Sequence, residues 1–291
     1  MANSYKVCIE KGDDPYNTTV SLLDKLDFWV EKKRVLIKPN LTTAKTSSEG
    51  ITTDVNVCRA ILERLKDCQV IIGDAGAGTK KALERNGYYK LGEEFNAEVK
   101  DLNDDEIVMK NVPNSVILKR VPLSKTALES DYIISVAKLK CHVLAQVTLC
   151  MKNMFGCVPR RTNRVQIHPL INDAIIDILQ ILWPSFCVVD GIIGNEREEV
   201  GSHPIKMGII IGGIDPLAVD KVGSQCMGLV PEEIRHIKGA EDMFGKREVQ
   251  IQGEPVEKVR KVFDRSPGLL TPIRYALESI SGKILRKFPR F

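Results

Sequence analysis

Short apolar runs that alternate with helical patterns constrain this chain more than any other feature of its sequence. The strongest runs are RVLIKPN at 34–40, CQVIIGD at 68–74, DYIISVAKLK at 131–140, FCVVDGIIG at 186–194 and IKMGIIIGGI at 205–214. Several are apolar almost without interruption, as strands buried on both faces of a sheet are. Because helical patterns separate these runs, the sequence predicts an α/β fold with a mostly parallel sheet covered by helices.

Weaker patterns add local detail to this prediction. The segment 115–121, SVILKRV, favours a strand, and a helix is expected to begin at Thr53 and to run through Lys66. Asp215 precedes a proline, which is typical of a helix with a capping aspartate and a proline in its first turn. A chain of 291 residues is long enough to bury the core of one large domain of this kind.

Charge divides the chain into a nearly neutral body and a basic tail. Residues 256–291 hold nine Lys or Arg residues against three acids, whereas residues 1–255 hold 33 bases and 35 acids. We therefore expect an α/β catalytic or binding domain at 1–255 and a basic amphipathic tail at 256–291. Such a tail can dock on an anionic membrane surface or an acidic protein, or it can cap the core of its own chain. The neutral body disfavours specific nucleic-acid binding.

Composition narrows the class of protein further. A hydrophobic content of 43% with 27% charged residues is that of a globular protein, and no apolar run is long enough for a transmembrane helix. The N-terminus shows no signal-peptide pattern. Eight cysteines occur without a CxxC pair, which indicates reduced thiols, a cytoplasmic location and no intrinsic iron–sulfur cluster.

Polar side chains occur at the ends of the predicted strands or just beyond them. Lys38 and Asn40 close one run, Asp74 closes the next, and Lys140 and Asp190 lie at the ends of later ones. Ligands of open parallel sheets bind at the carboxyl ends of the strands, so we expect these residues to share one site. The alternative for each is a local role, since such residues also end strands and cap helices.

A segment without acidic residues gives the strongest functional signal. Residues 132–172 contain no Asp or Glu but contain six cationic side chains, namely Lys138, Lys140, Lys152, Arg160, Arg161 and Arg164. Uncompensated positive charge predicts a bound phosphate or carboxylate. We expect the anion to be held by Lys152, Asn153, Arg160 and Arg161, with Lys38, Asn40 and Asp74 across the cleft. The alternative is a solvated basic loop with salt bridges to acids such as Glu198 and Glu199.

Two histidines and a glycine-rich turn complete the candidate site. His142 follows a predicted strand, where a general acid or base would be placed, and His168 closes the basic segment. The GDAGAG turn at 73–78 is suited to a phosphate cradle, although a tight strand-to-helix turn explains it as well. The sequence thus predicts a small-molecule enzyme that binds an anionic or phosphorylated substrate or cofactor. The alternative is a non-catalytic carrier that delivers a metal, a cluster or an anion to a partner.

The motifs VLIKPNLT, VIIGDAG, SDYIISVAKLKCH, TLCMKNMFGCVPRR, FCVVDGIIG and GGIDPLAVDKV closely resemble a family known as domain of unknown function 362. The resemblance runs from about Arg34 to about Ala240. Many members also carry a ferredoxin-type domain, so the resemblance implies redox chemistry and a redox partner. This chain lacks the CxxCxxC runs of that domain.

A more distant likeness is to nickel-pincer lactate racemase, through SDYIIS, the Cys141-His142 pair, Lys152, the following Val-Pro and His168. It implies that Lys152 holds a cofactor covalently, that His142 is a proton-transfer base and that His168 is a metal ligand. The second catalytic histidine of the racemase falls where this chain reads GDAGAG. Redox or isomerase chemistry is therefore favoured through resemblance alone.

Overall fold

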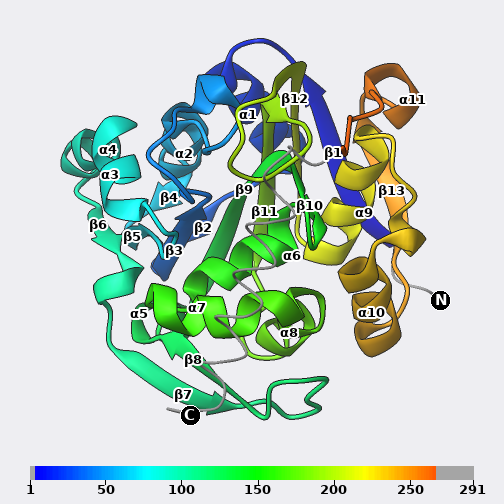
Figure 1. The fold of residues 1–291 in the computed structure, drawn as a ribbon. Helices are drawn as coiled ribbons and strands as arrows, with labels where there is room; N and C mark the ends of the chain where they lie inside the picture. The colour runs from blue at the N-terminus through cyan, green and yellow to red at the C-terminus, as the bar shows by residue number, and fades with distance from the viewer. Residues whose placement is uncertain (1–3, 267–291) are drawn as a thin grey trace.

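A computed structural model describes residues 4–266, and in this part of the chain nine strands form one sheet (Figure 1). The strand order is β13-β1-β12-β11-β9-β3-β5-β6, and β10 pairs with β9. These strands are β1 (Ser4–Lys11), β3 (Arg34–Pro39), β5 (Gln69–Asp74), β6 (Glu98–Asp101), β9 (Tyr132–His142), β10 (Gln146–Thr148), β11 (Phe186–Asn195), β12 (Pro204–Gly213) and β13 (Glu248–Gly253).

The sheet is mostly parallel, as the sequence predicts. Five neighbouring pairs run parallel, and only β12 and the short β10 run against the others. The direction of β12 has a simple cause. Only residues 196–203 connect β11 to β12, and a parallel crossover needs about a dozen residues or more.

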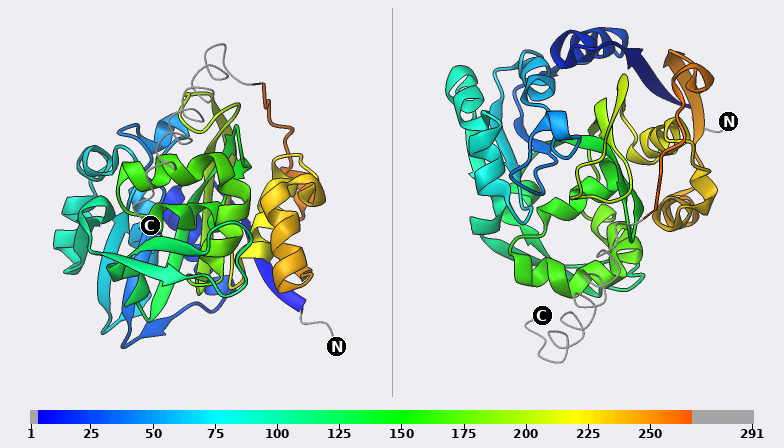
Figure 2. Two further views of the ribbon diagram at one scale, coloured as in Figure 1. Left: turned by 60° about the horizontal axis from the view of Figure 1, so that its bottom comes forward. Right: turned by 45° about the horizontal axis from the view of Figure 1, so that its top comes forward.

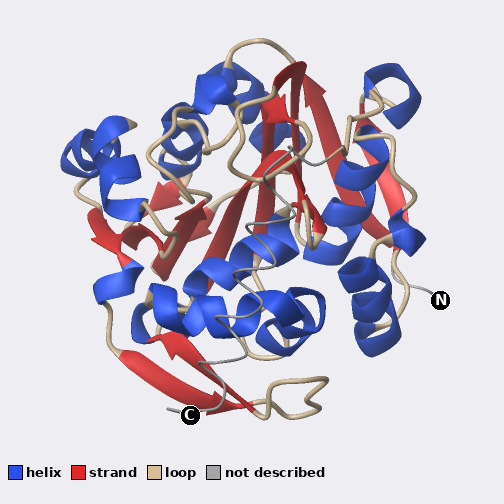
Figure 3. Ribbon diagram, viewed as in Figure 1, coloured by secondary structure: helices blue, strands red, loops and turns tan. Residues whose placement is uncertain are grey.

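Helices cover both faces of the sheet (Figure 3). They are α1 (Pro15–Lys25), α2 (Val55–Leu62), α3 (Thr79–Arg85), α4 (Tyr88–Phe95), α5 (Lys125–Leu128), α6 (Cys150–Asn153), α7 (Arg161–Ile167), α8 (Ile171–Leu179), α9 (Pro216–Cys226), α10 (Arg235–Phe244) and α11 (Val256–Val259). Side chains of a strand point alternately to its two faces, so the strands contribute to two apolar cores. One core contains residues of α1 to α4, and the other contains residues of α6, α8, α9 and α10. Figure 2 shows α3 and α4 far from α9 and α10, at opposite sides of the molecule.

The order of the strands creates a crevice between β3 and β9. From β3 the chain moves outward to β5 and β6, whereas from β9 it moves the other way to β11 and β12. The connection after β3 includes α2 on one face, and the connection after β9 includes α6 and α8 on the other. Connections that leave in opposite directions open a crevice at the carboxyl ends of the strands, where ligands of such sheets bind.

Two local predictions are wrong. Residues 115–118 form a turn rather than a strand, because the buried carboxylate of Asp177 accepts hydrogen bonds from three successive N–H groups, those of 116 to 118, at 2.7–2.9 Å. The strand β8 is Arg120–Ser124, and it forms a hairpin with β7 (Ile107–Asn111).

The helix after β3 is capped by Asp54, not Thr53, and ends at Leu62. The Thr53 hydroxyl instead donates to Val136 O at 2.8 Å and accepts from Asn40 N at 2.9 Å. The short strands β2 (Val30–Glu31) and β4 (Leu65–Lys66) pair beyond that helix end. Asp215 caps α9 as predicted, with Pro216 in its first turn.

The first part of the predicted tail packs on the domain. Val256, Val259 and Phe263 are buried in the same core as α9. The apolar stripe that the sequence predicts for the amphipathic tail lies outside the described residues and consists of Ile273, Leu277, Ile280, Ile284 and Phe288. Docking of this tail on a membrane or a protein therefore stays a prediction. No helix within residues 4–266 combines the length and apolarity needed to cross a membrane.

Candidate functional site

A pocket of about 210 Å³ lies at the carboxyl ends of β3, β5 and β9, in the crevice that the strand order creates. Seven of the predicted site residues line it, namely Asn40, Asp74, His142, Lys152, Asn153, Arg161 and His168. Pockets for drug-sized ligands measure about 300–1,000 Å³. This pocket therefore suits a smaller molecule.

A buried network joins the strands beneath the pocket. Lys38 Nζ forms an ion pair with Asp74 Oδ1 at 2.6 Å and donates to Asn153 Oδ1 at 3.0 Å. The Asn153 amide in turn donates to Lys38 O at 2.9 Å and to Ser135 Oγ at 3.1 Å. Asn40 donates to the same Asn153 oxygen at 3.1 Å. Asn153 therefore bridges β3 and β9, and the network gives the pocket a fixed floor.

Position 156 requires a glycine, because its backbone lies close to this floor. A Cβ atom at this position would lie 2.1 Å from Asp74 Oδ1 and 2.6 Å from Lys38 Nζ. Its carbonyl oxygen also accepts a hydrogen bond from Ala75 N at 3.0 Å. The KNMFG motif at 152–156 thus ends in a glycine because the backbone lies directly on the ion pair.

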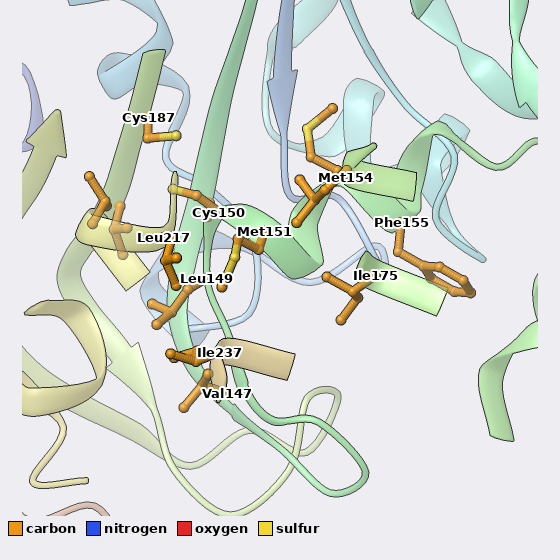
Figure 4. Packing of buried hydrophobic residues seen from close by; sticks show 14 of the residues in the cluster. Val147, Leu149, Cys150, Met151, Met154, Phe155, Ile175, Cys187, Leu217 and Ile237 are labelled. Atoms are coloured by element: carbon orange, nitrogen blue, oxygen red, sulfur yellow. The ribbon is translucent and has the colours of Figure 1, made fainter. Parts of the chain in front are cut away.

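Apolar packing and one carboxylate hold α6 in place. Cys150, Met151 and Met154 are buried, and Figure 4 shows them among Cys187, Leu217 and Ile175 of the surrounding strand and helices. Asp220 of α9 accepts hydrogen bonds from Cys150 N at 2.7 Å and Met151 N at 2.9 Å. This carboxylate satisfies two N–H groups that the first turn of a helix leaves unpaired. The backbone that carries Lys152 and Asn153 is therefore rigidly placed.

Lys152 brings an amine into the pocket. Among the residues that the structure describes, none forms a hydrogen bond or a close ion pair with its Nζ atom. Burial lowers the pKa of Lys152 to about 8, with Glu199 and Asp74 opposing the shift and Lys38 adding to it. A general acid or base works best when its pKa lies near the working pH. Lys152 meets that condition.

His142 is buried, and its hydrogen bonds assign its tautomer. Nδ1 accepts from the N–H groups of Leu144 at 3.2 Å and Ala145 at 3.1 Å. Burial, together with the charge of Lys152, holds the pKa of His142 well below 6.5, so the ring is neutral. A neutral ring with Nδ1 as acceptor carries its proton on Nε2, which lies 3.9 Å from Glu199 Oε2. These contacts favour a hydrogen-bond donor at His142 over the general base expected from the sequence.

Two arginines of α7 line the same pocket. Arg164 is buried, and its Nη1 donates to Asn103 Oδ1 and Val158 O, both at 2.8 Å. Its Nη2 is also buried but has no hydrogen-bond partner within residues 4–266. Burial lowers the pKa of Arg164, yet a guanidinium stays charged in proteins. Arg161 is exposed at the rim.

Four predicted site residues do not line the pocket. Lys38 lies beneath it in the ion pair with Asp74, and Asp190 pairs with Lys138 at 2.8 Å on the neighbouring strands. Lys140 is fully buried, and its Nζ atom joins two loops by donating to Ile51 O and Glu199 O. Burial lowers the pKa of Lys140 to about 7. Arg160 is exposed. Of the six cations of the acid-free segment, Lys138 and Lys140 are therefore buried structural residues, Arg160 is exposed outside the pocket, and the other three line the pocket.

Several residues that line the pocket were not assigned to ligand binding from the sequence, among them Thr42, Phe155, Arg164 and Glu199. Arg164 lay within the acid-free segment and could have been chosen there. Glu199 carries no comparable signal, because it reaches the pocket only through the loop between β11 and β12.

The His142 and His168 rings lie 5.4 Å apart in an edge-to-face arrangement. Within residues 4–266, no group of three His, Cys, Asp or Glu side chains could hold a metal ion. The role of His168 as a metal ligand therefore rests on the racemase likeness alone.

Fold and pocket together define a class: an α/β protein with a small cationic pocket at the switch point of a mostly parallel sheet. The family model for a domain of unknown function, DUF362, matches residues 35–225, and the chain belongs to this family. Every residue that lines the pocket lies within the matched range. The sequence resemblance to this family is thus confirmed.

Two further proteins are similar to this chain. A thylakoid-associated protein from Synechocystis sp. is 24% identical over 269 residues, which cover 88% of this chain and 83% of that protein. The apoprotein of lactate racemase from Thermoanaerobacterium thermosaccharolyticum has a TM-score of 0.43 and 11% identity over 84% of this chain. The chain spans 58% of the length of that racemase chain.

Proposed function

We propose that this protein is a small-molecule enzyme whose pocket binds an organic anion. The observation that carries the proposal is Arg164, a buried guanidinium in the pocket wall whose Nη2 has no partner within residues 4–266. A buried charged group without its hydrogen bonds costs free energy. A carboxylate or phosphate would supply the missing acceptor, and Arg161 would add a second charge.

The charge of the pocket supports an anion over a cation. Of the described residues that line it, Lys152, Arg161 and Arg164 are cationic, whereas Asp74 and Glu199 are acidic and Asp74 is neutralised by Lys38. The ligand can be a substrate or a phosphate-bearing cofactor, since phosphate and carboxylate both accept charge-assisted hydrogen bonds from arginine.

Proton transfer is the chemistry that the pocket residues suit. Lys152, with its pKa of about 8, can take up or release a proton near neutral pH. His142 can donate a hydrogen bond from Nε2 to an oxygen of the ligand without itself becoming charged. The sequence resemblance to the family favours redox chemistry within this frame, and the distant likeness to lactate racemase favours isomerase chemistry. A carrier that only binds and releases the anion would use the same pocket without turnover.

Thermal unfolding with inorganic phosphate tests the anion site. A ligand present at about 100 times its Kd stabilises the folded state by about 2.7 kcal/mol, so phosphate should raise the Tm. Arg164→Gln and Arg161→Gln should each remove most of this rise, which is measured within each variant. Arg160→Gln is the matched control, because Arg160 is exposed outside the pocket, and it should keep the full rise. Equal phosphate-induced shifts in all three variants would contradict the proposal.

A further inference from the structure

Lys152 is held more firmly than a surface lysine. Its neighbours in α6 are fixed on both sides, by Asp220 at the start of the helix and by the Asn153 network at its end. The amine itself forms no hydrogen bond with any side chain in the described part of the chain, although it lines the pocket. An amine on a rigid backbone that makes no hydrogen bond to the described residues is better suited to a chemical reaction than to structural support.

The surroundings of the amine favour its neutral, nucleophilic form. Burial disfavours the ammonium, and Lys38 lies close enough to add to this effect. Lysines become nucleophiles in this way, by desolvation or by a second cation nearby. Glu199 is the carboxylate that opposes this shift most strongly, and it lines the same pocket.

A hydrogen-bond donor lies in the same wall of the pocket. His142 presents Nε2–H beside Glu199, at 3.9 Å from its Oε2 atom. Such a neutral donor can polarise a carbonyl oxygen while remaining an imidazole. The two arginines of α7 complete the pocket with positive charge.

We propose that Lys152 forms an imine with the carbonyl carbon of a small organic acid whose acid group binds Arg161 and Arg164. This inference rests on the proposed function, because it places the anion in the same pocket. It names the ligand class: an acid that also carries an aldehyde or a ketone.

The step balances without an added oxidant or reductant. The ammonium first gives one proton to water, and the neutral amine then attacks the carbonyl carbon. A C–N bond forms, and the electron pair of the C=O double bond moves to the oxygen, which takes up that proton. The nitrogen then releases a second proton to water and the oxygen takes it up, so the oxygen leaves as water and a protonated C=N bond remains. The products of a lysine ammonium and a carbonyl are therefore one iminium and one water molecule.

Reductive trapping tests the proposal with two probes that have the same number of carbon atoms. Glyoxylate and acetaldehyde are both two-carbon aldehydes, and only glyoxylate carries a carboxylate. Each is incubated with the full-length protein and cyanoborohydride, and modified lysines are located by peptide mass spectrometry. The exposed Lys80 is the internal standard in every digest, which corrects for the different reactivity of the two aldehydes.

We expect glyoxylate to modify Lys152 well above Lys80. Acetaldehyde should show a much smaller preference, because it lacks the carboxylate and gains only from the lowered pKa of Lys152. Arg164→Gln should lower the Lys152 to Lys80 ratio for glyoxylate by roughly tenfold or more, since a charge-assisted hydrogen bond is lost. Arg160→Gln should leave the ratio unchanged. Lys152→Arg, which keeps the positive charge, should remove the pocket adduct while the phosphate-induced stabilisation persists.

Two outcomes overturn the inference in different ways. Equal modification of Lys152 and Lys80 by glyoxylate, with phosphate stabilisation intact, would refute the imine while the anion site stands. A preference for Lys152 that is equal for both aldehydes would refute the anionic ligand class. If phosphate also failed to raise the Tm, the proposed function and this inference would both be refuted.

Discussion

Nζ of Lys38 lies 2.6 Å from Oδ1 of Asp74, and neither side chain is exposed by more than 4%. The pair joins β3 and β5 at their carboxyl ends, directly beneath the pocket. Its two charges cancel, so the positive charge that a ligand meets comes from α6 and α7. Two residues that the sequence assigns to ligand binding therefore differ in role: Lys38 supports the floor, and Asp74 lines it.

Breaking this buried pair should be strongly destabilising. Removal of one partner of a buried ion pair costs about 3–5 kcal/mol, because the other charge is left buried without compensation. We expect this loss in the free energy of unfolding for Asp74→Asn, measured by urea denaturation. Glu106→Gln is the control, because it removes an exposed pair with Lys125 at 2.7 Å, which contributes about 0–1 kcal/mol. Similar losses in the two variants would show that the buried pair is not the support of the floor.

Gly156→Ala should disturb both stability and ligand binding. The added Cβ would lie 2.1 Å from Asp74 Oδ1, so the ion pair or the backbone must move. Overpacking of this kind costs about 1–3 kcal/mol, and the phosphate-induced rise in Tm should shrink with it. In the control Gly78→Ala the nearest atom would be 3.2 Å away, so the loss should be smaller than in Gly156→Ala. A stable Gly156→Ala protein with a full phosphate response would contradict this interpretation of the KNMFG motif.

The tautomer of His142 can be tested by two substitutions whose side chains have the same number of heavy atoms. The side-chain oxygen of Asn can replace Nδ1 as the acceptor for Leu144 N and Ala145 N, whereas Leu offers no acceptor. We therefore expect His142→Leu to be less stable than His142→Asn by about 1–3 kcal/mol, the cost of unsatisfied buried N–H groups. Urea denaturation of both variants measures the difference. If the leucine variant were the more stable one, the two hydrogen bonds to Nδ1 would not be those that hold the ring.

His236 should make the fold sensitive to acid. Burial lowers the pKa of His236 to about 3, and the charge of Lys152 adds to the effect. Between pH 6.5 and pH 3 the unfolded chain binds a proton that the folded protein does not, so stability falls as the pH falls. The slope from this one group is about 1.4 kcal/mol per pH unit.

The variant His236→Gln lacks this titration, so its stability should fall less steeply below pH 6 than that of the natural chain. Urea denaturation at pH 7, 6, 5 and 4 gives both curves, and their difference isolates His236 from the carboxylates and from His142. Parallel curves would show that His236 is protonated in the folded state.

Local sequence patterns were sufficient for the strands and for part of the site. The apolar runs at 34–40, 68–74 and 186–194 all form strands of the sheet. The positions of Asn40 and Asp74 at the pocket were predictable, because a parallel sheet brings the carboxyl ends of its strands to one edge. The capping role of Asp215 was predictable for a similar reason, since it depends on the few residues that follow.

Tertiary structure alone decided which polar residues reach the pocket. Lys138, Lys140 and His142 alternate along one strand, yet only His142, at the end of that strand, lines the pocket. The other two lie deeper, where Asp190 and loop carbonyls bind them. Glu199 enters the pocket only because β11 lies beside β9. Strand order and depth depend on contacts between residues far apart in the chain, and no local pattern of residue types records those contacts.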